Sequence, residues 1–356
     1  NNSKIAKIKT KLIFTANEIK ISEFLYTEAK NSMKIVNLVL NKNLQIRKIQ
    51  ELKLNTFKNN LENNNFKIKF GSKIIVNGSS FDSTNLVNSI KDKKENSTFD
   101  LISKDLEINI DSVNGKFYNT INKFKLIGKI KKGKITKILS KSEISENKYL
   151  DISLREDPKS NRKILEIYSD IPKLILDGFS FFEGIEEGSL LYTNEFDNVN
   201  SYSNLTIENF KVVKAPAFAK LLSLADFKGM LDLLSGEGIS FDILEINFSN
   251  NKKVLQIKEI IAIGPSISIL MDGYVVNKSG LTSLRGTMVP AKFLNTLISK
   301  IPVLGDILIP KEVGEGLFGI SFKIKGLPEK IKTSVNPIKT LTPRFITKIL
   351  ERKKNN

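Results

Sequence analysis

The chain has 356 residues and a formal net charge of +18, from 56 basic and 38 acidic residues. It contains no cysteine and no histidine, which excludes disulfides, thiolate chemistry and the usual ligands of zinc, haem and copper sites. The missing histidine also removes the commonest general base. We therefore expect no catalytic residues, no metal and no cofactor, and an enzyme is the least supported class of function.

The positive charge resides almost entirely on lysine. Only six basic residues are arginine, at positions 47, 155, 162, 285, 344 and 352. Proteins that read nucleic acids favour arginine for its planar, bidentate guanidinium, so we expect no nucleic-acid partner. Two explanations of the lysine excess stay open. One is a function that needs positive charge, and the other is a codon bias toward A and T that also enriches asparagine and isoleucine.

Alternation of apolar and polar residues dominates the chain and predicts a protein that is mainly β. A period of two is typical of a strand with one apolar and one wet face. The clearest such stretches are 66–70, 106–110, 150–154, 165–167, 205–207 and 318–324. Turn-forming clusters at 76–79, 157–161, 250–253 and 277–280 separate the strands. Links this short join antiparallel neighbours, because a parallel crossover needs a dozen or more residues.

A few short amphipathic helices interrupt the predicted strands, mostly toward the C-terminus. Proline in a first turn and glycine after a last turn mark their ends. We predict helices from Asp82 through Ile90, after Asp170 with Pro172 in the first turn, from Pro216 toward Gly236, over 291–301, and after Pro343.

The helix over 291–301 and the segment 303–309 behind it form an apolar hairpin with two interpretations. In one, the hairpin lies in a membrane interface, because lysines at 292 and 300 flank its apolar stripe and suit anionic headgroups. In the other, the same residues plug the end of the sheet. The predicted membrane-contact residues are Phe293, Leu297, Ile298, Ile301, Leu304 and Ile307.

Two motifs are better explained by structure than by ligand binding. The run GEGLFG at 314–319 fits the dinucleotide pattern, but an alternating strand follows it where that fold needs a helix. The Lys/Asn-rich stretches, such as KKGK at 131–134, suit either phosphate contact or a solvated strand face. The solvated face is favoured because most of these stretches lie on alternating strands opposite apolar residues.

The second half of the chain resembles a known family. The runs NLTIENFKVVKAPAFAKLLSLADFKGMLDLLSGEGISFDILEINF, AIGPSISILMDGYVV and LRGTMVPAKFLNTLISKIPVLGDIL are similar to the C-terminal region of the bacterial AsmA-like superfamily, in its YhdP-type branch. The match is ordered from about residue 165 to 350. IIVNGSSFDSTNLV and LEINIDSVNGKF resemble, more weakly, the domain before it. We therefore predict a β-rich groove segment over 1–164 and an AsmA-like region over 165–356.

The resemblance implies a long curled antiparallel sheet with an apolar inner groove. It implies a periplasmic protein that a helix upstream of this chain anchors in the inner membrane. Members are thought to move phospholipid between the inner and outer membranes, so phospholipid, the membrane surface and envelope proteins are the implied partners. The family brings no catalytic residues.

The residues alone leave two functions open, because a sheet with one apolar side must bury that side in something. A groove that carries acyl chains is the first, and an envelope scaffold whose core is filled by its own side chains is the second. Four isoleucines on either side of the Gly264–Pro265 turn are expected to share the apolar interior and to line the groove, namely Ile257, Ile261, Ile267 and Ile269.

Overall fold

A computed structural model of the chain describes residues 5–84, 102–115, 120–160, 162–176, 182, 184–213, 216–224, 231, 234–290 and 319–338. The chain divides into two compact units, Asn1–Leu165 and Glu166–Asn356. The predicted division between residues 164 and 165 falls beside this boundary. Each unit is mainly β, and the 21 described strands belong to one open sheet.

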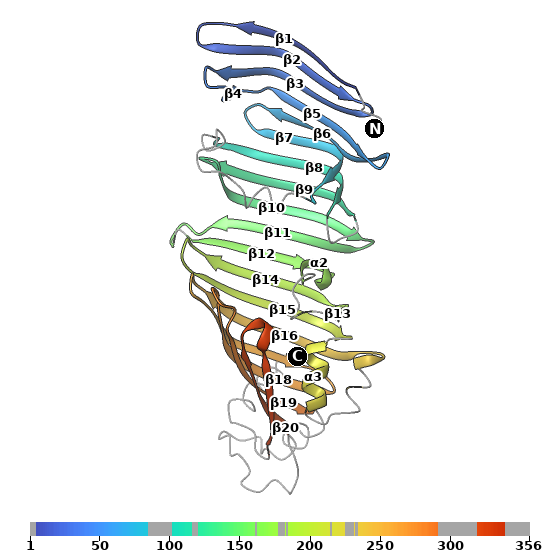
Figure 1. The fold of residues 1–356 in the computed structure, drawn as a ribbon, viewed down its shortest axis with the longest axis vertical. Coiled ribbons are helices and arrows are strands. Elements are labelled where there is room, and N and C mark those ends of the chain that lie inside the picture. Colours follow the sequence, from blue (N-terminus) through green and yellow to red (C-terminus); the bar gives the residue numbers. More distant parts are fainter. Residues whose placement is uncertain are drawn as a thin grey trace. The chain divides into compact units, whose positions relative to one another are not determined.

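The first unit is a meander of long strands (Figure 1). Its strands are β1 (Ala6–Phe14), β2 (Glu18–Glu28), β3 (Asn31–Asn41), β4 (Ile46–Lys48), β5 (Glu51–Lys58), β6 (Leu61–Phe70), β7 (Ile74–Asp82), β8 (Lys104–Asn114), β9 (Ile121–Lys131), β10 (Lys134–Ser145) and β11 (Lys148–Glu156), and β12 (Lys163–Ser169) runs across the boundary. Most strands pair with the strand that follows them in sequence, and β3 pairs with both the short β4 and β5, so the contacts are mostly local.

One strand pair corrects the prediction of a purely antiparallel sheet. Strands β7 and β8 are parallel, with Ile74 opposite Leu106 and Val76 opposite Ile108. The connection between these strands runs over 83–103, which is long enough for the crossover that parallel neighbours need. The sheet is therefore mixed.

The predicted turn at 76–79 is also wrong, because these residues lie inside β7. An Asn-Gly pair between apolar residues is a strong hairpin signal, yet Gly78 here stands opposite Phe66 within the β6–β7 ladder, next to a register shift. A Cβ at position 78 would lie 2.4 Å from the carbonyl oxygen of Asn65. The glycine serves a close approach of two strands rather than a turn.

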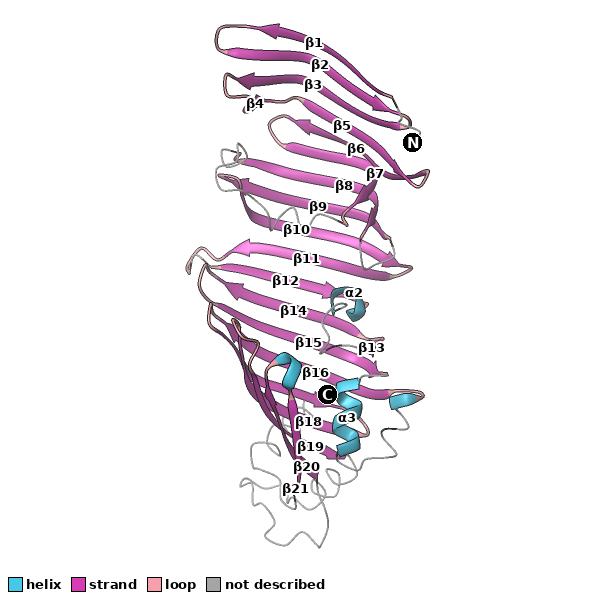
Figure 2. Ribbon diagram, in the orientation of Figure 1, coloured by secondary structure: helices cyan, strands magenta, loops and turns pink. Residues whose placement is uncertain are grey.

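The second unit curls its strands around a helix (Figure 2). Its strands are β13 (Ile185–Glu186), β14 (Ser189–Phe196), β15 (Ser201–Val212), β16 (Ile239–Asn250), β17 (Val254–Ile263), β18 (Ile267–Val276), β19 (Thr282–Pro290), β20 (Gly319–Gly326) and β21 (Lys332–Ile338). Their described pairings are antiparallel. The predicted turns at 157–161, 250–253 and 277–280 lie between strands as expected.

Two of the predicted helices are confirmed. Helix α2 (Pro172–Leu176) begins at the expected proline, and α3 (Pro216–Leu224) begins at Pro216. A single 3-10 turn, η3 (Pro328–Lys330), joins β20 to β21. The helix predicted from Asp82 begins where β7 ends, and its residues from 85 onward lie outside the described part of the chain, as do the helices predicted over 291–301 and after Pro343. None of the described helices is long and apolar enough to cross a membrane.

Candidate functional site

The first unit presents a continuous apolar face that crosses strands β1 to β7. Residues directly opposite each other in a ladder share a face, so a row can be followed from strand to strand. One row runs through Phe24, Ile35, Leu52, Ile68 and Val76, and a second runs through Ile8, Tyr26, Met33, Leu54 and Phe66. We call these ten residues, together with Leu12, Ile21, Leu38, Phe70 and Ile74 on the same side, the open face.

The open face is a single layer of side chains. Among the described residues of the first unit, no helix and no second sheet lies over it. Most of its members are half-buried, and Ile21 and Ile74 are buried. Toward the edge strand β1 the exposure rises to 63% for Ile8 and 44% for Leu12. The open face is therefore the candidate binding surface of the first unit.

The opposite side of the same strands is wet and charged. On β1 it carries Lys7, Lys9 and Lys11, which alternate with the apolar residues. Exposed ion pairs cross the strands here, with Lys34 Nζ 2.8 Å from Glu23 and Lys67 Nζ 3.2 Å from Glu51. The sheet of the first unit is therefore amphipathic, and only its charged side is well solvated by water.

Paired kinks keep the apolar residues on one side along the full strand length. Asn37 on β3 has a positive φ of 51°, and it faces the extra residue Ser22 on β2. Both strands gain one residue at the same level, so their ladder stays in register while β1 shifts against β2. Because of this kink, Phe24 and Ile21 share the open face although they are three residues apart.

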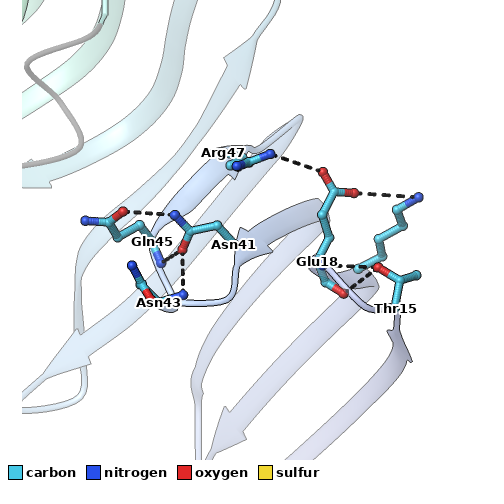
Figure 3. Close-up of polar contacts among 7 residues, drawn as sticks. Thr15, Glu18, Asn41, Asn43, Gln45 and Arg47 are labelled. Carbon is cyan, nitrogen blue, oxygen red and sulfur yellow. Dashed lines mark hydrogen bonds and ion pairs between the residues drawn. The ribbon is translucent and has the colours of Figure 1, made fainter.

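The turns at the end of β3 surround a small polar hollow, and the side chains beside it hydrogen-bond to one another and to the turn backbone (Figure 3). The Oδ1 of Asn41 accepts from the backbone N–H groups of Asn43 at 3.0 Å and Gln45 at 2.9 Å. Arg47 lies 3.7 Å from Glu18, whose backbone carbonyl accepts from the hydroxyl of Thr15 at 3.0 Å. These side chains close the hairpins, and the geometry offers no reacting pair.

The second unit differs because its apolar side is filled. Leu222 of α3, Ile207 of β15 and Met288 of β19 are fully buried in one cluster with residues from most strands of the unit. Phe210 and Phe241 stack within it, with 5.3 Å between ring centroids. A sheet curled around a helix in this way forms a packed core rather than an empty channel.

The four isoleucines predicted to line the groove are divided by a bulge. Ile257 and Ile269 pack at the margin of the filled core, and Ile267 is fully buried inside it. Ile257 pairs with Gly273 but Ile260 pairs with Met271, so β17 has one extra residue near Lys258. Ile261 is therefore buried on the other side of the sheet, at 2% exposure. That any of the four contacts lipid stays a prediction, and their burial among neighbouring side chains favours a role in packing.

The predicted membrane contacts Phe293, Leu297, Ile298, Ile301, Leu304 and Ile307 all lie outside the described residues. The open face of the first unit was not named from the sequence as a site. Its signal is present in the alternation of β6, but the kinks at Ser22 and Asn37 interrupt the same signal in β2 and β3.

Within the described part of the chain, no three acidic side chains converge as a metal site would require. Four buried side-chain oxygens there have no hydrogen-bond partner, on Asn55, Ser140, Asp151 and Ser268. They are scattered over strands β5, β10, β11 and β18 and do not converge. No family model, no curated protein and no solved structure matches this chain.

Proposed function

We propose that this chain is a non-enzymatic protein of the bacterial envelope that binds phospholipid and transfers it between the inner and outer membranes. The observation that carries the proposal is the open face, an apolar surface that the described residues leave uncovered and that a charged surface backs. The resemblance to AsmA-like proteins supplies the setting, a periplasmic chain with an anchor upstream. Membrane surfaces and envelope proteins are the partners that go with it.

The dimensions of the open face suit acyl chains. The row from Phe24 to Val76 crosses five strands, which at a strand spacing of ~4.8 Å makes about 19 Å. One leaflet contributes about half of the ~30 Å hydrocarbon core of a bilayer, so a fatty acyl chain is about 15 Å long. A chain lying on such a row would bury apolar area on both partners at roughly 25 cal/mol per Å².

The experiment uses the absence of tryptophan from the chain. Phe66→Trp puts a single indole on the open face, and Leu25→Trp puts one on the opposite side, where Leu25 stands between Lys9 and Lys34. With vesicles of bromine-labelled phosphatidylcholine, the fluorescence of the first variant is expected to be quenched and that of the second is not. Equal quenching, or none, would count against lipid on the open face. Solvent extraction of the purified protein gives an independent readout of bound phospholipid.

The second candidate function is an envelope scaffold with a self-filled core, and the second unit favours it. Its core cluster includes the helix α3 and leaves Leu222, Ile267 and Met288 without exposed surface. The tryptophan experiment separates the two functions, because a scaffold would leave both variants unquenched.

A further inference from the structure

The outward side of the β9–β10 hairpin brings lysines into direct opposition. Three cross-strand pairs are lysine against lysine: Lys125 with Lys141, Lys129 with Lys137, and Lys131 with Lys134. All six side chains are exposed. A register shift between Ile135 and Lys137 returns Lys137 to the side that Lys134 occupies. We call these six residues the lysine strip.

The strip is electrostatically unfavourable for the fold itself. Like charges directly opposite in a ladder destabilise a sheet. None of the six lysines forms an ion pair with any residue that the structure describes, although Lys141 lies over the ring of Tyr149, 4.8 Å from its centroid. Three such pairs in one hairpin are not needed to keep a strand face wet, since the neighbouring strands achieve this with mixed charges.

An exposed apolar pair lies within the strip. Ile127 and Leu139 are cross-strand partners between the first two lysine pairs, and they are 62% and 49% exposed. Their neighbours on the other side of the sheet, such as Leu126 and Ile138, are half-buried. The hairpin therefore presents two aliphatic side chains within a row of ammonium groups.

Carboxylates beside the strip neutralise it only in part. Asp105 on β8 stands opposite Lys129, and Asp151 on β11 stands opposite Lys141. Glu107, opposite Ile127, is bound by Lys73 instead, and that hydrogen bond lowers the pKa of its carboxyl. The strip keeps an excess of positive charge that neighbouring strands do not cancel.

The residue types in the strip indicate which class of anionic partner it binds. Protein interfaces are enriched in arginine and aromatic residues and depleted of lysine. Surfaces that bind single-stranded nucleic acid stack bases on aromatic rings, and base readers use arginine. The six residues of the strip include neither, and the ring of the neighbouring Tyr149 lies against Lys141. Lysine is a flexible point charge whose stem lies along apolar surface while its ammonium meets headgroups, and an aliphatic pair among lysines suits a membrane interface.

We propose that the lysine strip docks this protein on an anionic membrane surface, with Ile127 and Leu139 inserted among the headgroups. This membrane contact lies on the side of the sheet opposite the open face. It does not depend on lipid binding by the open face. A lysine near a charged bilayer contributes about 1 kcal/mol, so removing one pair is expected to weaken binding roughly 30-fold.

The test is flotation of the full chain with phosphatidylcholine vesicles that contain or lack phosphatidylglycerol. Wild type is expected to float only with the anionic vesicles. The double variant Lys129→Gln, Lys137→Gln should bind the anionic vesicles roughly 30-fold more weakly than wild type. The double variant Ile127→Ser, Leu139→Ser should also bind more weakly than wild type, and this loss should persist at high salt. The melting temperature should be unchanged or higher in the lysine variant, because a repulsion has been removed.

The matched control removes another lysine pair from the same side of the sheet. Lys53 and Lys67 are direct partners across β5–β6, so Lys53→Gln with Lys67→Gln removes the same charge elsewhere. Binding close to wild type is expected. An equal loss would mean that overall charge drives association and would overturn the proposal. Wild type that ignores anionic vesicles but binds polyglutamate through the strip would overturn it in favour of an acidic protein partner.

Discussion

Phe66 stands directly opposite Gly78 across the β6–β7 ladder, next to a register shift between Asn65 and Phe66. A Cβ built on Gly78 would lie 2.6 Å from the Cβ of Phe66 and 2.4 Å from the carbonyl oxygen of Asn65. The ring of Phe66 also meets Phe81 edge-on, with 5.7 Å between centroids. Phe66 can therefore take this position only because residue 78 has no side chain.

Gly78→Ala is therefore expected to destabilise the first unit by about 1–3 kcal/mol, the usual cost of overpacking. The measurement is the urea midpoint followed by circular dichroism. Gly71→Ala is the control, because its Cβ would meet only the carbonyl oxygen of Lys73, at 3.7 Å. Equal midpoints for the two variants would show that the strands can separate at Gly78 without cost.

The filled core of the second unit predicts a different sensitivity from that of the open face. Leu222→Ala removes a fully buried side chain of α3 and should cost about 2–5 kcal/mol. Leu52→Ala, on the half-buried open face, should cost clearly less, because solvent already reaches the site. Thermal unfolding of the two variants compares them. A larger loss for Leu52→Ala would mean that the open face is covered in solution.

Introducing a charged residue on the open face should reduce lipid binding without unfolding the protein. Ile68 and Val76 are direct partners there, and both are half-buried. Ile68→Asp is expected to reduce the phospholipid recovered by solvent extraction severalfold, while the protein stays folded because the carboxylate can remain hydrated. Lys69→Asp, one residue along on the wet side, should leave the lipid content unchanged. Lipid retained by Ile68→Asp would place the acyl chains elsewhere.

Acid should weaken the first unit through Asp82 at the end of β7. The hydroxyl of Thr84 and then its backbone N–H, at 3.0 Å from Oδ1, donate to this carboxylate and lower its pKa in the folded state. The folded pKa lies below the unfolded one, so the stabilisation is fully present above about pH 4 and disappears as the pH falls through the folded pKa. Asp82→Asn should therefore be less stable than wild type at neutral pH, and the difference should vanish in strong acid. A constant difference at all pH values would contradict this role.

The sequence predicted the strands better than the way they pair. Alternation placed β6, β8, β11, β12 and β15 correctly, because a half-buried strand imposes a period of two on its own residues. Short links predict antiparallel neighbours, whereas β7 and β8 are parallel, and the Asn-Gly pair predicts a turn, whereas it lies inside β7. Both errors concern contacts with a partner strand, which local propensity does not encode.

The candidate site was less predictable than the fold. Alternation indicates that one side of a strand is apolar, but it does not say what covers that side. Both units have apolar sides of similar composition, yet α3 fills one, while the described residues leave the other open. The kinks at Ser22 and Asn37 also shift the pattern by one residue, so Ile21 and Phe24 do not look like neighbours on one face.

A bulge in β17 places Ile257 and Ile261 on opposite sides of the sheet. Lys258 lies at the bulge of β17, and the ladder on either side of it is regular, with Ile257 opposite Gly273 and Ile260 opposite Met271. Deleting Lys258 would join these two ladders in one register and leave every apolar residue on its present side. The variant is expected to fold, with a melting temperature within a few degrees of wild type, since among the described residues the side chain of Lys258 contributes a contact with the ring of Tyr202 and no core packing.

Deleting Glu245 provides the contrast, because β16 is regular there and Leu244 and Ile246 both belong to the core. A one-residue slip moves the following side chains to the opposite face, so this variant should fail to form the second unit. Soluble expression and a circular-dichroism melt compare the two deletions. Equal damage from both would show that the extra residue at 258 is required by the fold, and that the division of the isoleucines is not a local bulge.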